Sequence, residues 1–204
     1  MGLLLFVSAC SSLPSLPGSQ KASPRAETEV KTEAGEPQAL REQTVVPPAV
    51  ANEYANAVFL MEAGDQQGAE AQFRQFASRY PEYPAPWVNL AIIAAAQGRD
   101  ADALTALEKA LAINPDYAPA LNQLGILYRK TGQFSDAEAA YLKAVTVQPD
   151  YALAHLNLGI LLDLYLGRLP EALTAYQSYQ ALTPDEDKLV ARWITDLTRR
   201  TGGQ

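Results

Sequence analysis

The sequence predicts an all-α fold built from a repeated helix–turn–helix unit of 34 residues. Prolines followed by an acidic residue, glycines and alanines each recur at this spacing, with one extra residue in the fourth unit. Self-similarity at a fixed period of about 20–50 residues is typical of repeat arrays, in which each unit packs mainly on its neighbours. The recurring residues are Pro81, Pro115, Pro149 and Pro184; Gly64, Gly98, Gly132 and Gly167; Ala69, Ala103, Ala137 and Ala172; and Phe73, Leu107, Tyr141 and Tyr176.

The composition excludes several classes of site. The chain has 204 residues, 48% of them hydrophobic, which suffices for one ordinary domain with extensions. One cysteine cannot form an internal disulfide or a thiolate metal site, and one histidine excludes a two-histidine zinc site. The formal net charge of -7 opposes binding to a polyanion. We therefore expect no metal or other cofactor and no nucleic-acid partner.

Residues 1–10 predict an export signal. The apolar run Leu3–Val7 is far too short to cross the ~30 Å hydrocarbon core of a bilayer, and small residues follow it, as in a secretory signal. The tetrad Val7-Ser8-Ala9-Cys10 resembles a bacterial lipobox, which implies that Cys10 carries acyl chains such as palmitate and becomes the N-terminus. Ser11 after the cysteine implies the periplasm-facing side of the outer membrane. The alternative is a chance apolar N-terminus with a buried free cysteine.

Residues 11–48 predict a disordered tether. They contain no aromatic residue and are rich in Pro, Ser, Glu, Gln and Ala. Such a segment buries too little apolar surface to offset the entropy of ordering it. As a flexible coil it would reach roughly 30–40 Å, and we expect it to hold the folded part away from a membrane.

Each recurring residue has a physical role within a helix–turn–helix unit. Glycine ends the first helix because it adopts the left-handed cap conformation without penalty. Asp or Ser residues soon after three of the glycines would cap the second helix, and Pro170 would lie in the first turn of the fourth. The alanines let the helices approach, the large residues four positions later fill the space between them, and the prolines end the second helix.

These positions resemble the tetratricopeptide repeat family. The family pattern of a large apolar residue, a leucine and a small residue is matched at Trp87-Leu90-Ala91 and Leu121-Leu124-Gly125, and at His155-Leu158-Gly159 except for its first position. The first unit is degenerate, with Glu53 and Asn56 where apolar residues belong. The resemblance implies a right-handed superhelix of about four repeats within residues 49–185. The expected repeats are 50–83, 84–117, 118–151 and 152–185.

Residues 186–204 predict a capping helix and tail. Apolar residues form a one-sided stripe over residues 189–197, and charged residues occupy the other side. A repeat array needs such a cap because its last unit would otherwise expose its stacking face. We expect Trp193 to cover the fourth repeat.

The resemblance also implies that the first helix of each repeat lines a concave groove. Equivalent positions there carry amides and isoleucines, which could bind the backbone and apolar side chains of an extended peptide. A basic pair in the third repeat could receive an acidic group of the partner, although a solvated charged face is the simpler interpretation. The candidate peptide-binding residues are Asn89, Ile92, Asn122, Gln123, Ile126, Arg129, Lys130, Asn157 and Ile160.

Three functions are compatible with this sequence. The first is a non-catalytic scaffold, anchored to the outer membrane, that binds a protein or extended peptide during envelope assembly, in pilus, secretion or peptidoglycan-enzyme complexes. The second is a structural lipoprotein that self-associates through its degenerate first repeat. The third is an enzyme or accessory protein acting on envelope polymers, for which the sequence offers only His155, Asp163 and Glu171. No catalytic motif is present, and we expect no enzymatic activity.

Overall fold

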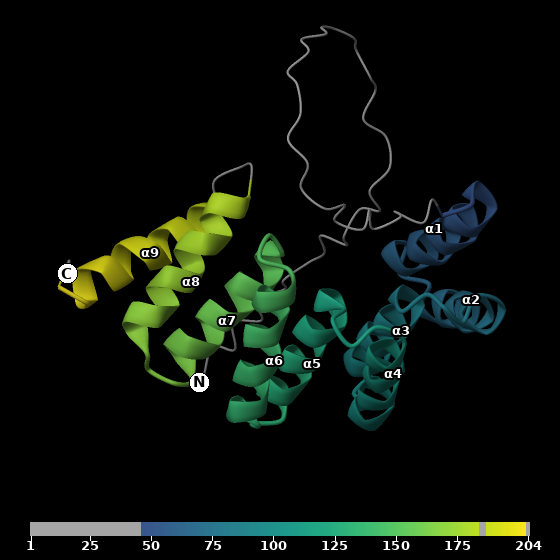
Figure 1. Cartoon of the computed structure of the whole chain (residues 1–204), viewed down its shortest axis with the longest axis horizontal. Coiled ribbons are helices and arrows are strands. Elements are labelled where there is room, and N and C mark those ends of the chain that lie inside the picture. The colour runs from purple at the N-terminus through teal and green to yellow at the C-terminus, as the bar shows by residue number, and fades with distance from the viewer. Residues whose placement is uncertain (1–45, 184–186, 203–204) are drawn as a thin grey trace, which may run out of the picture. The chain divides into compact units, whose positions relative to one another are not determined.

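The computed structural model describes residues 46–183 and 187–202, and the helices of these ranges confirm the predicted all-α class, with no strand among them (Figure 1). The predicted export signal, Cys10, residues 11–45 of the predicted tether and Pro184 lie outside the described residues. The helices are α1 (Pro48–Glu62), α2 (Gln66–Arg79), α3 (Ala85–Ala96), α4 (Asp100–Ile113), α5 (Ala118–Lys130), α6 (Phe134–Val147), α7 (Ala152–Leu164), α8 (Leu169–Leu182) and α9 (Lys188–Arg200).

Consecutive helices pack as pairs, and each pair packs on the next along the chain (Figure 1). We number the pairs as repeats: α1–α2 is repeat 1, α3–α4 repeat 2, α5–α6 repeat 3 and α7–α8 repeat 4. The first helices α3, α5 and α7 are also neighbours, so residues at equivalent positions on them lie near one another. None of the described helices is long and apolar enough to cross a bilayer.

The four pairs turn at the predicted glycines. Gly64, Gly98, Gly132 and Gly167 have φ values of 83°, 74°, 79° and 67°, a region that costs a residue with a Cβ. The extra residue of the fourth unit lies in the α7–α8 turn, where the amides of Leu166 and Arg168 donate to the carbonyls of Leu161 and Leu162 (3.1 and 2.9 Å). The longer turn absorbs the insertion, so the stacking of repeat 4 on repeat 3 is retained.

The predicted caps of the second helices are confirmed only in repeat 1. There the side chain of Asp65 accepts a hydrogen bond from the amide of Gly68 (2.9 Å). In repeats 2 and 3 the prediction was wrong, because the N-cap is always the residue directly after the glycine, and that residue is Arg99 or Gln133. Asp100 instead begins α4, where a negative charge still interacts favourably with the helix dipole.

The large residues predicted to fill each helix pair form the centre of the core. Phe73, Leu107, Tyr141 and Tyr176 are each at most 1% exposed. In repeats 3 and 4 the residue opposite the tyrosine is a glycine. A Cβ added to Gly125 would lie 2.5 Å from Tyr141 Cε1, and one added to Gly159 would lie 2.6 Å from Tyr176 Cδ1. Repeats 3 and 4 therefore accommodate a larger ring by removing a methyl group from the facing helix.

The helix α9 covers the end of repeat 4, as predicted. Asp187 caps it by accepting hydrogen bonds from the amides of Leu189 (2.9 Å) and Val190 (3.2 Å). The buried side chains of Val190 and Leu197 face α8, and the ring of Trp193 lies 5.3 Å from that of Tyr176. This contact removes apolar surface of the last repeat from water.

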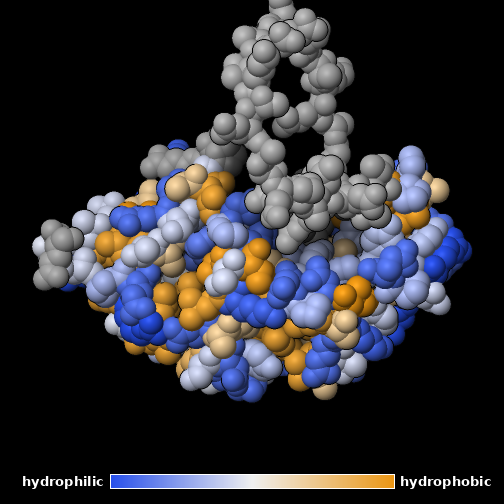
Figure 2. Space-filling view, viewed as in Figure 1, coloured by the Kyte–Doolittle hydropathy of each residue, from blue (hydrophilic) through white to orange (hydrophobic). Residues whose placement is uncertain are grey.

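Apolar side chains that remain exposed are scattered over the array. Figure 2 shows them interspersed with hydrophilic side chains on the face viewed, as is normal for single apolar residues on a protein surface. The most exposed of the large ones are Phe59 on α1 (64%) and Leu164 at the end of α7 (70%).

Candidate functional site

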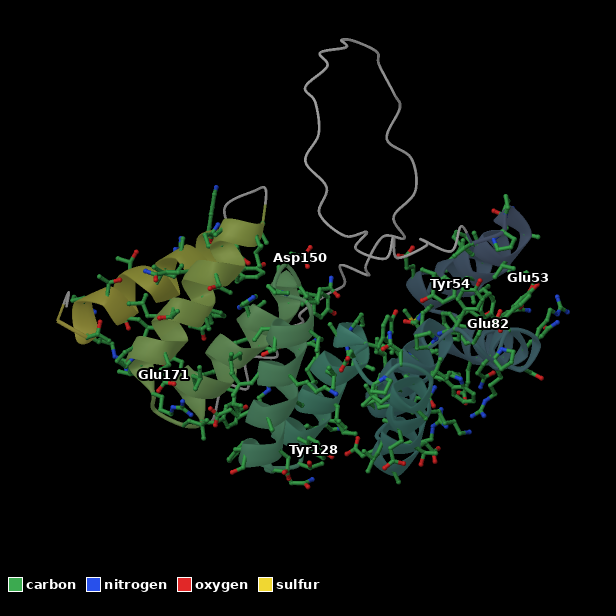
Figure 3. All side chains as sticks on the ribbon, in the orientation of Figure 1. Glu53, Tyr54, Glu82, Tyr128, Asp150 and Glu171 are labelled. Atoms are coloured by element: carbon green, nitrogen blue, oxygen red, sulfur yellow. The ribbon has the colours of Figure 1, made fainter. Side chains whose placement is uncertain are left out.

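The predicted amide row begins with Asn89, which the structure buries. Its side chain is 3% exposed and its Nδ2 donates to the hydroxyl of Tyr54 on α1 (2.7 Å; Tyr54 is labelled in Figure 3). Burial raises the pKa of Tyr54, so the hydroxyl stays protonated and neutral. Asn89 therefore joins repeats 1 and 2, and its amide is not presented to solvent.

The same bond recurs between repeats 3 and 4. Asn157 Nδ2 on α7 donates to Asn122 Oδ1 on α5 (3.0 Å), and Asn122 is 1% exposed. Asn122 and Tyr54 occupy equivalent positions of their repeats, as do Asn157 and Asn89. A polar pair of this kind satisfies the buried asparagine of each pair and fixes how the two helices meet.

The middle of the row is different because Val88 stands where Tyr54 and Asn122 provide an acceptor. Gln123, the equivalent of Asn89 and Asn157, is partly exposed and its side chain makes no hydrogen bond within the described residues. The row is thus no uniform ladder of exposed amides. Two of its members link repeats, whereas the side chain of Gln123 makes no hydrogen bond within the described residues and keeps both N–H donors and its carbonyl acceptor free.

The three predicted isoleucines form a second row. Ile92, Ile126 and Ile160 lie one turn further along α3, α5 and α7, are partly buried, and pack with one side against the core. Ile126 lies one turn from Gln123 on α5. An apolar strip beside a free amide is the combination that an extended peptide can use.

The predicted basic pair is engaged within the molecule. Lys130 Nζ lies 2.5 Å from Asp100 Oδ1 and also donates to the carbonyl of Ala95 (3.3 Å). The guanidinium of Arg129 lies 5.9 Å from the centre of the Tyr165 ring, within the range of a cation–π contact.

Arg129 also acts on Tyr141, whose hydroxyl is buried without a hydrogen-bond partner among the described residues. Burial raises the pKa of Tyr141 to about 12, and the charge of Arg129 opposes that rise. Tyr141 therefore keeps its proton, and Arg129 supplies the nearest favourable charge.

The three residues considered for catalysis do not converge. His155 Nε2 lies 2.9 Å from the carbonyl oxygen of Pro149, Asp163 lies 3.9 Å from Arg200, and Glu171 pairs with Arg168. Asp150, near the start of α7, and Glu171 lie at opposite ends of the α7–α8 pair (Figure 3). Over residues 46–183 and 187–202, no group of three His, Cys, Asp or Glu side chains could hold a metal ion.

Two features of the site were not predicted from the sequence. Tyr54 lies in the degenerate first unit, and its role as acceptor for Asn89 is not among the positions that the 34-residue pattern singled out. The second is a set of charged residues on and directly before the second helices, in which Arg99 reaches Glu70 of the preceding repeat. The sequence did contain a signal for these ion pairs, because the two members of each pair lie about one repeat apart along the chain.

Three tetratricopeptide repeat models match the sequence, at residues 57–83, 82–150 and 122–187. Together they span the helix pairs from within α1 to the start of α9. No curated protein matches the chain.

Solved structures with a similar fold include PilF of Pseudomonas aeruginosa, with a TM-score of 0.66 and 20% identity over 75% of this chain and 69% of that one. A thermophilic protein of the same repeat type from Thermus thermophilus has a TM-score of 0.64 and 26% identity over 74% and 82% of the two chains. MamA has a TM-score of 0.58 and 21% identity over 72% and 84%. These likenesses establish the architecture of stacked helix pairs.

Proposed function

Because this chain is a tetratricopeptide repeat protein, we propose that it is a scaffold without chemistry of its own that binds an extended segment of a protein partner. The all-α superhelix of such repeats supports a protein-interaction role, as does the likeness to other proteins of this architecture. The lack of a convergent set of titratable groups among His155, Asp163 and Glu171 is consistent with this role.

The observation that carries the proposal is the free amide of Gln123 beside the row of isoleucines. A peptide backbone presents an N–H and a C=O at each residue, and one glutamine amide can pair with both. Ile92, Ile126 and Ile160 would receive apolar side chains of the same segment. Asn89, Asn122 and Asn157 would contribute indirectly, because their hydrogen bonds hold the neighbouring helices in register.

Arg129 and Lys130 would favour a bound segment that places an acidic group next to them. An acidic group of the partner could compete with Asp100 for Lys130, since that pair is exposed and such pairs are worth at most about 1 kcal/mol. We expect this contribution to be small.

The proposal places the scaffold at the outer membrane, facing the periplasm. The lipobox-like tetrad ending at Cys10 supports a lipid anchor, and the composition of residues 11–48 supports a flexible tether. A tethered scaffold raises the effective concentration of its partner at the membrane. Assembly of pili or secretion machinery, or of peptidoglycan-enzyme complexes, would make use of this arrangement.

The test is affinity capture of partners from solubilised membranes. We expect Gln123→Ala to reduce recovery of the specific partner several-fold, while the exposed Gln177→Ala on α8 serves as matched control. Circular dichroism would verify that both variants keep the helical fold. Equal recovery with Gln123→Ala and the wild type would remove Gln123 from the binding surface.

Self-association remains a second candidate, favoured by the exposure of Phe59 on α1, the first helix of the array. An apolar side chain on an end repeat could stack against another copy. Sedimentation of the full chain at increasing concentration, with Phe59→Ser as comparison, separates the two functions. A strictly monomeric wild type would eliminate this candidate.

A further inference from the structure

The interfaces between successive repeats differ in their polar links. Two sets of equivalent positions can provide such links. One set lies on the first helices and is occupied by the pairs Tyr54–Asn89 and Asn122–Asn157. The other joins the second helix of one repeat to the residue that precedes the second helix of the next.

This second set forms an arginine clamp at two interfaces. Between repeats 1 and 2, Arg99 lies 2.8 Å from Glu70 and also binds Asp102 (3.0 Å). Between repeats 3 and 4, Arg168 pairs with Glu138 and with Glu171. Each arginine thus joins an acid of its own repeat to an acid of the preceding one.

The interface between repeats 2 and 3 has neither link. At the clamp positions it carries Leu104 and Gln133 instead of a glutamate and an arginine. At the amide positions it carries Val88 opposite Gln123. Both exceptions fall at the same interface, although they lie on different helices.

The charged contacts across the interface between repeats 2 and 3 are made by lysines instead of arginines. Lys130 pairs with Asp100 (2.5 Å) and Lys143 with Asp116 (3.2 Å), and in both pairs each side chain is at least 36% exposed. In the arginine clamps the bridging acids Glu70 and Glu138 are only 21% and 22% exposed. Lysine is a compact, strongly hydrated charge without the fork geometry of arginine, and exposed pairs are screened by salt.

The apolar contacts, by contrast, continue across this interface. One cluster is built from α1 to α4 and takes Ala120 and Leu127 as buried members from α5. A second is built from α6 to α9, and a third joins Ala118 and Leu121 of α5 to Ala144 and Ala154 of the next two helices. The polar links, and not the apolar packing, therefore distinguish the interface between repeats 2 and 3 from the other two.

We propose that the interface between repeats 2 and 3 is a compliant joint whose angle varies more than that of the other two interfaces and whose stiffness depends on salt. In a repeat array each unit interacts mainly with its neighbours, so weakening one interface concentrates bending there. The joint lies beside Gln123, and its movement would change the spacing between the first helices α3 and α5. This inference stands on the contacts alone and does not require that Gln123 binds a peptide.

The test measures the width of distance distributions between spin labels by electron paramagnetic resonance. Exposed, equivalent positions on α2, α4, α6 and α8 allow matched pairs across the three interfaces, in a full chain carrying Cys10→Ser. The label sites are Ser78→Cys, Ala112→Cys, Thr146→Cys and Ala181→Cys.

We expect the pair at 112 and 146 to give a distribution roughly twice as wide as the pairs at 78 and 112 and at 146 and 181. Raising the ionic strength from about 0.01 M to about 1 M shortens the screening length from about 30 Å to about 3 Å. It should widen the distribution at 112 and 146 further and leave the other two nearly unchanged.

Two variants test whether the arginine clamp, and not the spin label itself, determines the width of the distance distribution. Arg99→Gln copies the residue at Gln133 on a partly exposed site and should widen the pair at 78 and 112 toward the width found at the joint. Leu104→Glu with Gln133→Arg installs the missing clamp and should narrow the pair at 112 and 146. Equal widths at all three interfaces, or no effect of Arg99→Gln in a folded protein, would overturn the proposal.

Discussion

Gly125 lies so close to the ring of Tyr141 that an added Cβ would be 2.5 Å from Cε1. The two residues belong to facing helices of one repeat, and Tyr141 is fully buried. In repeat 2 the equivalent positions hold Ala91, which is larger than glycine, and Leu107, which is smaller than tyrosine. The volume shared by each pair of helices is therefore divided differently from repeat to repeat.

Gly125→Ala should destabilise the fold despite the better helix propensity of alanine. Overpacking costs about 1–3 kcal/mol, against a propensity gain of about 1 kcal/mol, so we expect a net loss of up to about 2 kcal/mol. Denaturant unfolding measures this loss. Adding Tyr141→Leu, which copies Ala91 and Leu107, should recover part of the stability. If the double variant is less stable than Gly125→Ala, the volume argument fails.

Asn157→Ala should cost about 1–3 kcal/mol of unfolding free energy, because it leaves the buried oxygen of Asn122 without its donor. A second change, Asn122→Val, removes the unsatisfied group and copies Val88, so the double variant should regain part of the loss. Gln123→Ala has no such partner within the described residues and should stay within about 0.5 kcal/mol of the wild type. Equal losses for Gln123→Ala and Asn157→Ala would contradict the assignment.

The array should lose stability above pH 10. Burial raises the pKa of Tyr141 and of Tyr151 to about 12, whereas an unfolded tyrosine titrates near pH 10. The folded state therefore holds more protons between these values, and its stabilisation, full below pH 10, is lost as the pH rises through the folded pKa. Ultraviolet absorbance of tyrosinate measures this, since part of the 10 tyrosines should titrate only as the helices unfold. Normal titration of every tyrosine in the folded protein would be the contrary result.

Cys10→Ser should release the protein from the membrane fraction of a bacterium that processes lipoproteins. Intact mass spectrometry of the wild type should find a chain that begins at Cys10 and carries acyl chains, and none on the variant. Ser12→Ala is the matched control and should leave both the mass shift and the membrane fractionation unchanged. An unmodified wild-type chain would rule out the proposed anchor.

The repeat architecture could be predicted because its signals are local and periodic. The turn glycines, the small residues and the buried rings depend on backbone conformation and on packing within one helix pair, which the spacing of the residues reveals. The one-residue insertion was visible for the same reason and lies in the α7–α8 turn.

The state of the candidate site could be predicted only in part. Aligning by 34 residues groups Asn89, Gln123 and Asn157 as one row, but their hydrogen bonds run diagonally, to a residue 35 positions earlier. Whether the amide at one of these positions is hydrogen-bonded therefore depends on the residue 35 positions earlier. For Gln123 that residue is Val88, whose side chain has no hydrogen-bond acceptor. The caps of α4 and α6 escaped prediction because helix start depends on the conformation of the preceding glycine and not on the nearest capping side chain.

The helix α9 also limits how a protein of this design can lengthen. Its inner side covers repeat 4, while its outer side carries Lys188, Arg192 and Arg199, which no further helix pair could bury without losing their hydration. New repeats added after α9 would meet a mainly charged surface, on which Leu189 is the exposed large apolar side chain among the described residues. Duplication of internal helix pairs, with α9 kept last, is therefore the route by which relatives with more repeats would arise.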